Sequence, residues 1–382
     1  MNMRVWFFFL FLIPGVSVQA EPHFDQERTF SLLSRALAQF EQIEQLPESR
    51  WLRRDQEGAT NRMNRFIDDA IRTLDAPDLV KSRESYRKLE TSIGDEKKRI
   101  AELRERRAFA PASDVTTVTK YTPTQTLRRL TASTRGDYDL LIEAHQDNVD
   151  AYERELSLIK NRMSDSLAEL GIDMPADQLE LWLSSAIGDD VISMGVVFQS
   201  IREVTLRLAE LTQESGENLE FARRYYGMVV ILHKLVVRMQ EDFIHKIDTD
   251  ILPNLASYRD EADEIITTSR RLLRDGGSRS SLESNIAANE LTKQAINLYT
   301  RIVQSQRKKV SEALMISKRE EQVAINTYQT VRLSSHVSQL IRDGLSTFET
   351  LSNLQIPDTA EFQNNEIREE FKKLTERLNA PM

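Results

Sequence analysis

Residues 296–331 read INLYTRIVQSQRKKVSEALMISKREEQVAINTYQTV, a stretch without glycine or proline in which apolar side chains return at every seventh position. The positions that keep this spacing are Ile296, Val303, Val310, Ala324 and Val331. Ser317 fills the one polar step in the series. A seven-residue repeat is typical of an α-helix that packs along a neighbouring helix as in a coiled coil. The stretch therefore predicts one long helix, which we expect to extend over residues 282–351.

The second row of this heptad pattern is half polar. It consists of Tyr299, Gln306, Ala313, Glu320 and Thr327. Such a row cannot hold a stable dimer by itself, so we expect the helix to pack across a bundle, with part of the row left to water or a partner. We define the candidate partner seam as Ile296, Tyr299, Val303, Val310, Ala324 and Val331.

The rest of the chain has the composition of a helical protein. Only 12 of its 382 residues are glycine and 10 are proline, too few for the many turns of a β-sandwich, barrel or propeller. Apolar residues at spacings of three and four recur from residue 24 onward and form a long stripe over residues 124–170. The predicted fold is all-α, an elongated helical bundle with long coiled-coil-like helices.

The pattern of breaks along the chain predicts five parts. Residues 108–123 hold four threonines and two prolines, which disfavour a helix, so we interpret them as a linker. The five parts are a signal peptide (1–20), an N-terminal helical region (21–107), the Thr/Pro-rich linker (108–123), a main long-helix bundle (124–356) and a C-terminal tail with a short amphipathic helix (357–382).

The first twenty residues have the layout of a secretory signal peptide. Arg4 precedes the apolar run VWFFFLFLI at residues 5–13, and a small-x-small site, VQA, ends at Ala20. The run is too short for a spanning helix, although an uncleaved anchor remains the alternative. No cysteine follows, which excludes a lipoprotein. We expect cleavage near Ala20 and a periplasmic or otherwise exported chain with no membrane span after cleavage.

The residue inventory narrows the possible chemistry. The absence of cysteine removes disulfides, thiolate metal sites and cysteine nucleophiles, and the five histidines have no zinc-binding spacing. Phosphate-binding glycine loops and serine-nucleophile motifs are also absent from the sequence. We therefore expect no cofactor, no metal and no enzymatic activity. The formal net charge of −9 argues against binding nucleic acid or anionic lipid through bulk charge.

One segment could line a small pocket. Residues 225–237 form the most apolar stretch after the signal segment and carry a histidine–lysine pair, and two glycines at 188 and 195 flank an acidic pair. Each feature also has a structural interpretation, because an acidic residue beside a helix start is a common cap and a lysine at a core edge can reach water. The candidate pocket residues are Asp189, Asp190, Gly195, His233 and Lys234.

Three hypotheses follow for function. The first is an exported, non-enzymatic helical scaffold or adaptor that makes protein–protein contacts with unidentified proteins of the bacterial cell envelope, or with further copies of itself. The second is a helical small-molecule-binding sensor or carrier. The third is a peripheral membrane-binding protein that uses one helix face.

Overall fold

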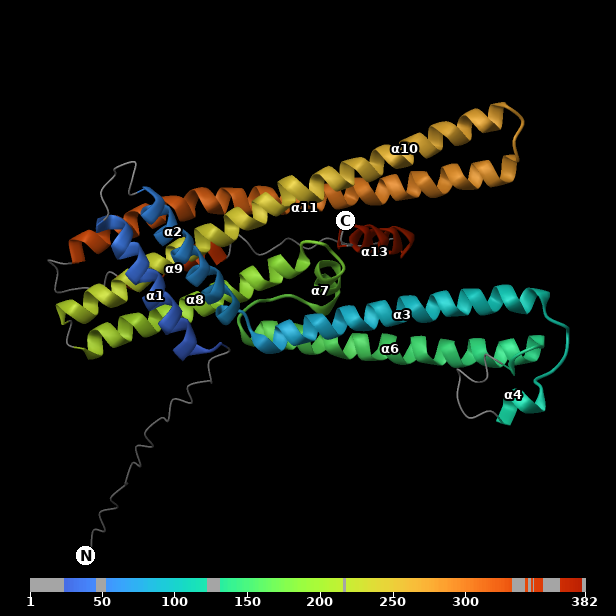
Figure 1. The fold of residues 1–382 in the computed structure, drawn as a ribbon, viewed down its shortest axis with the longest axis horizontal. Coiled ribbons are helices and arrows are strands. Elements are labelled where there is room, and N and C mark those ends of the chain that lie inside the picture. Colours follow the sequence, from blue (N-terminus) through green and yellow to red (C-terminus); the bar gives the residue numbers. More distant parts are fainter. Residues whose placement is uncertain are drawn as a thin grey trace, which may run out of the picture.

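The computed structural model describes residues 24–45, 53–121, 131–215, 218–331, 341–342, 345, 347–352 and 365–379, and the predicted signal peptide lies outside them. The fold is all-α, as predicted, and the described residues contain no strand. Long helices run roughly along one axis of an elongated molecule (Figure 1). The helices are α1 (Gln26–Gln45), α2 (Arg53–Leu74), α3 (Pro77–Phe109), α4 (Thr117–Tyr121), α6 (Arg135–Glu169), α7 (Ala176–Leu183), α8 (Gly188–Glu214), α9 (Leu219–Lys246), α10 (Leu252–Arg274), α11 (Arg279–Val331) and α13 (Asn365–Asn379).

Local turn signals set several helix ends where the sequence places them. Helix α2 ends at Leu74 and α3 begins at Pro77, because proline has no amide hydrogen to donate and fits the first helical turn. Helix α10 ends before Gly276, whose φ of 89° is a left-handed conformation that favours glycine. Helix α13 covers the predicted amphipathic helix of the tail.

Helices α9 and α10 form one continuous rod of 56 residues, joined by the π-helical segment Ile247–Ile251. Pro253 lies in the first turn of α10 and cannot donate an α-helical hydrogen bond, and the wider π turn before it absorbs the mismatch.

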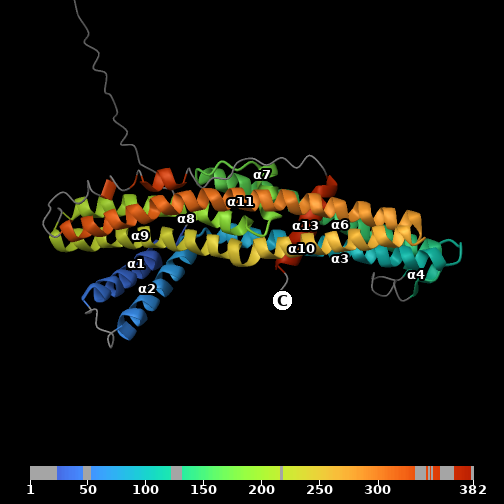
Figure 2. The same ribbon diagram turned by 90° about the horizontal axis from the view of Figure 1, so that it is seen from above.

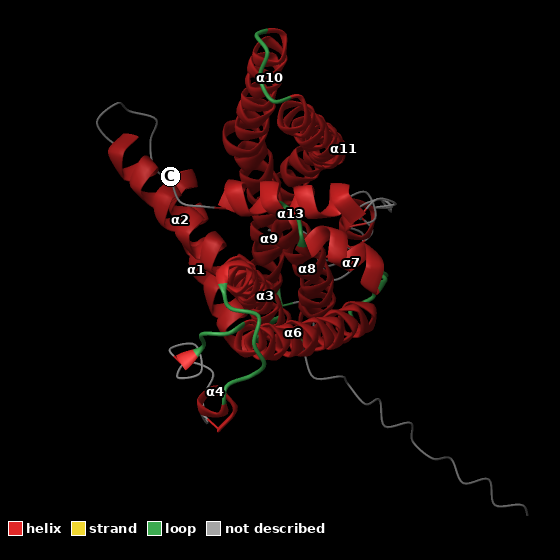
Figure 3. Cartoon of the chain, turned by 90° about the vertical axis from the view of Figure 1, so that its right-hand side faces the viewer, coloured by secondary structure: helices red, strands yellow, loops and turns green. Residues whose placement is uncertain are grey.

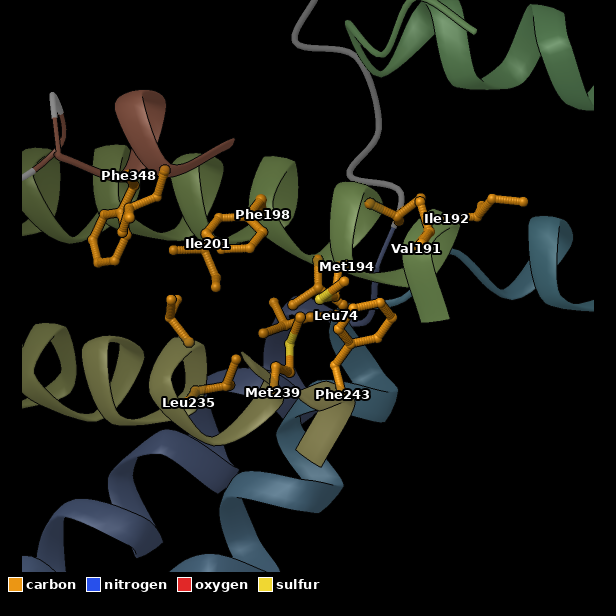
Figure 4. Close-up of a cluster of buried hydrophobic side chains, with 14 of the residues drawn as sticks. Leu74, Val191, Ile192, Met194, Phe198, Ile201, Leu235, Met239, Phe243 and Phe348 are labelled. Carbon is orange, nitrogen blue, oxygen red and sulfur yellow. The ribbon is translucent and has the colours of Figure 1, made fainter. Parts of the chain in front are cut away.

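The core lies where α8 and α9 run side by side. Phe198 and Ile201 on α8 face Leu235 and Met239 on α9, and Leu74 enters from the end of α2 (Figure 4). Helices α1 and α2 form a hairpin that packs on this pair and projects obliquely from the body (Figure 2). The apolar segment at residues 225–237 therefore lies in the central helix of the body, as its composition predicts.

Two helical hairpins extend from the body toward the same end of the molecule (Figure 1). We call the α3–α6 hairpin the first arm and the hairpin of α10 with the start of α11 the second arm. The base of the first arm is fixed by Arg83, whose guanidinium lies 2.6 Å from the Asp75 carboxylate and donates to the Asp189 carbonyl at 3.0 Å. Because these groups are buried, their pairing holds the arm to the start of α8.

Helix α13 crosses between the two arms (Figure 3). Phe371 stacks on Tyr299 of α11 with ring centroids 3.9 Å apart. The amide of Ala186 donates to the Tyr299 hydroxyl, which donates to Thr375, and the Thr375 hydroxyl donates to the Ser184 carbonyl at 2.6 Å. Lys372 also reaches Glu90 of α3 at 3.6 Å. The C-terminal helix is thus a brace that joins both arms and the body.

The Thr/Pro-rich stretch is not the interdomain linker that the sequence predicts. Residues 110–116 and α4 form the far end of the first arm, and α3 on one side pairs with α6 on the other. The predicted boundary between regions 21–107 and 124–356 therefore cuts through a single hairpin. The physical reason is that α3 has one apolar face, which only α6 covers along most of its length.

The candidate partner seam lies inside the molecule. All six side chains are 0–3% exposed, and α11 packs along α9. The seam is therefore an internal packing surface in this fold and not the partner surface that the sequence analysis predicts. A heptad pattern shows that a helix face is covered, but it does not distinguish a helix of the same chain from a helix of another.

Candidate functional site

The five candidate pocket residues do not meet in one site. Asp189 and Asp190 lie at the start of α8, where Asp190 pairs with Lys246 of α9 at 2.6 Å. His233 lies thirteen residues before Lys246 on α9, about 20 Å away along the helix. Gly195 faces Ile172, with room for a methyl group. The structure thus separates the acidic pair from the histidine–lysine pair.

His233 and Lys234 have structural roles. The His233 ring is buried and stacks on Phe348 at 4.4 Å between centroids. Burial lowers the pKa of His233 to about 4, so the ring is neutral near pH 7. Lys234 pairs with Glu321 of α11 at 2.6 Å, and its amine lies 5.1 Å from the centre of the Phe40 ring. Lys234 is thus engaged in an ion pair, whereas His233 is buried against Phe348 and its Nδ1 has no hydrogen-bond partner among the described residues.

A cleft of about 590 Å³ lies at the base of the first arm, between α3, α6, α7 and α13. Burial raises the pKa of the Glu90 carboxyl in this cleft, although the nearby Lys372 opposes the shift. The cleft's charges neutralise one another, because Lys160 pairs with Glu180 at 2.7 Å and Lys97 pairs with Glu153 at 3.4 Å. Sequence reasoning did not find this cleft, because its walls come from four helices that are far apart in the chain.

Exposed apolar side chains gather at the far end of the first arm. Phe109 is 88% exposed, Tyr121 is 76% exposed and Val118 is 63% exposed. We define the tip surface as Phe109, Val115, Val118 and Tyr121, which all lie at the end of α3, in the following loop or in α4. Large apolar residues at such exposure are typical of contact surfaces when they gather in one place. In the sequence, this surface could have been recognised from the aromatic residues within the Thr/Pro-rich stretch.

The tip is held by a buried carboxylate. Asp137, which is 0% exposed, accepts hydrogen bonds from the amides of Thr116, Ser133 and Thr134 at 2.7–3.3 Å. Its partner in the capping box at the start of α6 is the Thr134 hydroxyl. Burial by itself would raise the pKa of Asp137, but these hydrogen bonds outweigh it and lower the pKa to about 2. The loop is therefore a built structure that presents the tip surface in one geometry.

Gly136 lets the tip loop lie directly against α6. A Cβ atom at this position would lie 2.5 Å from the Val115 amide nitrogen and 2.6 Å from the Asp114 carbonyl carbon. Only glycine permits so close an approach of two backbones. The chain thus places loop residues 113–116 over the first turn of α6.

Replacing Asp137 with Ala should open the tip without unfolding the arm. Three amides would lose their acceptor, at a cost of about 1.5–3 kcal/mol for a bond to a charged group. Hydrogen exchange of residues 110–121 should accelerate at least tenfold, whereas residues 90–100 should keep their protection. Asp139→Ala is the control, because Asp139 is half exposed and pairs only with Arg107 at the surface. Equal exchange in the two variants would contradict this role.

The pH dependence of the tip follows from the same carboxylate. The folded pKa of about 2 lies below the value of about 3.9 for an unfolded aspartate. The stabilisation is therefore fully present above about pH 4 and is lost as the pH falls through about 2.

A buried polar pair fixes the register of the first arm. Glu96 on α3 bonds to Nδ1 of His145 on α6, and its other oxygen lies 3.0 Å from Arg99. Ile93, Ile100 and Val149 surround the pair with apolar side chains. A buried polar contact of this kind disfavours any slip of one helix along the other. The tip is thus carried at a fixed distance from the body.

The opposite end of the molecule also presents apolar side chains. Helix α9 begins there, and Leu219 is 54% exposed and Phe221 is 45% exposed (Figure 1). The Phe221 ring lies 6.1 Å from that of Tyr225 in a stacked geometry. We call Leu219 and Phe221 the blunt end. Among the described residues, the exposed aromatic side chains are Phe109, Tyr121 and Phe221, at the two ends of the long axis.

Neither a membrane-spanning helix nor a metal-binding cluster is present in the described part of the chain. No helix there is long and apolar enough to cross a bilayer. The same residues hold no group of three or more histidine or carboxylate side chains arranged for a metal ion. No family model, no curated protein and no solved structure matches this chain.

Proposed function

We propose that this protein is an exported, non-enzymatic helical scaffold or adaptor of the bacterial cell envelope, which binds a partner protein at its blunt end. The observation that carries the proposal is the position of its exposed aromatic residues at opposite ends of an elongated body. An adaptor needs two separated attachment points and a rigid connection between them. The buried Arg83–Asp75 pair, the Glu96–His145 contact and the α13 brace supply that rigidity.

Two features distinguish this proposal from a small-molecule carrier. The cleft at the base of the first arm is of ligand size, but four of its charged groups already pair with one another, Lys160 with Glu180 and Lys97 with Glu153. The tip and the blunt end, in contrast, present exposed apolar side chains within the part of the chain that the structure describes. Export rests on residues 1–20, and a mature N-terminus near Glu21 in the purified protein would support that part of the proposal.

Photo-cross-linking from the blunt end tests the adaptor function. With benzoylphenylalanine in place of Phe221, we expect one discrete protein adduct in intact cells, and we expect Leu219→Asp in the same chain to abolish it. The matched control carries the cross-linker in place of Met315, which is 64% exposed on α11 but distant from the blunt end. Identical adducts from both positions would contradict a specific contact, and adducts that contain only this chain would indicate self-assembly instead.

A further inference from the structure

The far part of the first arm carries a net charge opposite in sign to that of the whole chain. Residues 97–139 contain ten lysines or arginines and five acidic residues, a net charge of +5, whereas the whole chain carries −9. The comparable end of the second arm, residues 260–290, carries four basic and seven acidic residues, a net charge of −3. The positive charge is therefore a property of the far end of the first arm and is not shared by the far end of the second arm.

Three of the cations in the far part of the first arm are exposed near the tip surface. Arg104, Arg106 and Lys120 are exposed, and they form no ion pair with any residue that the structure describes. Phe109 and Tyr121 lie close to them in the chain, at the end of α3 and in α4. Basic side chains around exposed aromatic and apolar residues form the pattern that binds the interface of an anionic bilayer.

The net negative charge of the body does not cancel this attraction. Tyr86 is the last residue of α3 in the main core, and Phe109 lies 23 residues further on, about 35 Å along the helix. The Debye length at physiological ionic strength is about 8 Å. A surface in contact with the tip is therefore several screening lengths from the acidic body. The argument from bulk charge against anionic lipid does not apply to an arm of this length.

The shape of the tip also favours a bilayer over a protein groove. A standard protein interface buries about 800 Å² on each partner. The tip surface consists of four exposed side chains at the end of α3, on a short loop and on a five-residue helix. A projecting apolar point needs no complementary pocket to enter a fluid interface, because lipids rearrange around it.

We propose that the tip surface of the first arm binds an anionic phospholipid bilayer, with Phe109, Val118 and Tyr121 inserted at the headgroup level and Arg104, Arg106 and Lys120 against lipid phosphates. This inference rests on the adaptor function and names the partner of its second attachment point. In this arrangement the first arm attaches the protein to the membrane, and the blunt end lies at the opposite end of the molecule, away from the lipid surface.

Co-sedimentation with vesicles tests this inference in the mature full-length chain. We expect at least tenfold more bound protein on vesicles of 30% phosphatidylglycerol in phosphatidylcholine than on pure phosphatidylcholine, and at least a fivefold decrease in 500 mM NaCl. Phe109→Ser with Tyr121→Ser should reduce binding at least fivefold, and Arg104→Glu with Arg106→Glu should do the same. These positions are exposed, so the variants should keep the helical circular dichroism of the parent.

The second arm and the blunt end provide matched controls. Arg271→Glu with Arg274→Glu changes two exposed arginines at the end of α10, and Phe221→Ser removes an exposed aromatic ring. Both variants should bind vesicles as the parent does. Equal binding by tip and control variants, or no preference for the anionic vesicles, would overturn the proposal.

The two proposals fail in different ways. If vesicles are not bound while position 221 still yields its specific adduct, the lipid proposal is wrong and the adaptor function stands. If vesicles are bound but position 221 yields no specific adduct, the membrane contact stands without the adaptor function.

Discussion

Replacing Val310 with Glu should reduce the free energy of unfolding by about 4 kcal/mol or more. Val310 is 0% exposed on α11, in the main core cluster. An ionised carboxylate without a partner is very costly at such a site, and a protonated one still lacks a hydrogen-bond acceptor for its proton. Because whole domains are stable by about 5–15 kcal/mol, this one change removes a large part of the total. Urea denaturation followed by circular dichroism measures the loss.

Met315→Glu on the same helix is the matched control. Met315 is 64% exposed, so the same glutamate should change the free energy of unfolding by less than about 0.5 kcal/mol. Comparing the Val310→Glu and Met315→Glu variants also distinguishes two possible roles of the candidate partner seam. If the seam bound a partner, Val310→Glu would disrupt association and leave a helical monomer. If it packs internally, the monomer itself should unfold.

Gly188→Ala should strongly destabilise the fold, because the added methyl group has no room at the start of α8. A Cβ atom at this position would lie 1.5 Å from the carbonyl oxygen of Trp182 and 2.4 Å from its carbonyl carbon. Both are backbone atoms at the end of α7, so no side-chain rotation relieves the overlap. Separating α7 from α8 would also disturb Ser184 and Ala186, which bind the Tyr299–Thr375 pair. We expect a loss of about 3 kcal/mol or more.

Gly195→Ala, about two helical turns further along α8, is the comparison. Its Cβ atom would lie 3.4 Å from the Ile172 side chain, an ordinary contact, and alanine favours a helix over glycine by up to about 1 kcal/mol. The variant should be unchanged or slightly more stable in the same denaturation experiment. Similar losses for the two alanine variants would show that close packing at Gly188 does not control the α7–α8 junction.

The Gly188 experiment also probes the α13 brace. The Thr375 hydroxyl of α13 donates to the Ser184 carbonyl, in the loop that ends at Gly188. Phe371 of α13 stacks on Tyr299, which accepts a hydrogen bond from the same loop. A shift of that loop should loosen α13 before the rest of the body. Hydrogen exchange of residues 365–379 should therefore increase in Gly188→Ala more than that of the central helix α9.

Sequence reasoning located most of the helices because helix ends depend on local chemistry. Pro77 begins α3 and the Gly276–Gly277 pair separates α10 from α11, and each effect acts within a few residues of backbone. It did not find the tip, because the local propensity of residues 108–123 is that of any polar connection. Whether such a segment links two domains or ends one hairpin depends on α3 and α6, which lie on either side of it.

The sequence by itself determined an all-α chain, the covered face of each long helix and the apolar character of α9, because periodicity and composition depend on the backbone of a single helix. Only the tertiary structure decided that the seam of α11 is covered within the same chain, that Asp189 and His233 lie apart, and that Phe109 and Tyr121 share one end of the first arm. The physical reason is that burial identifies a face but not its neighbour, and the neighbour depends on which helices the turns bring together.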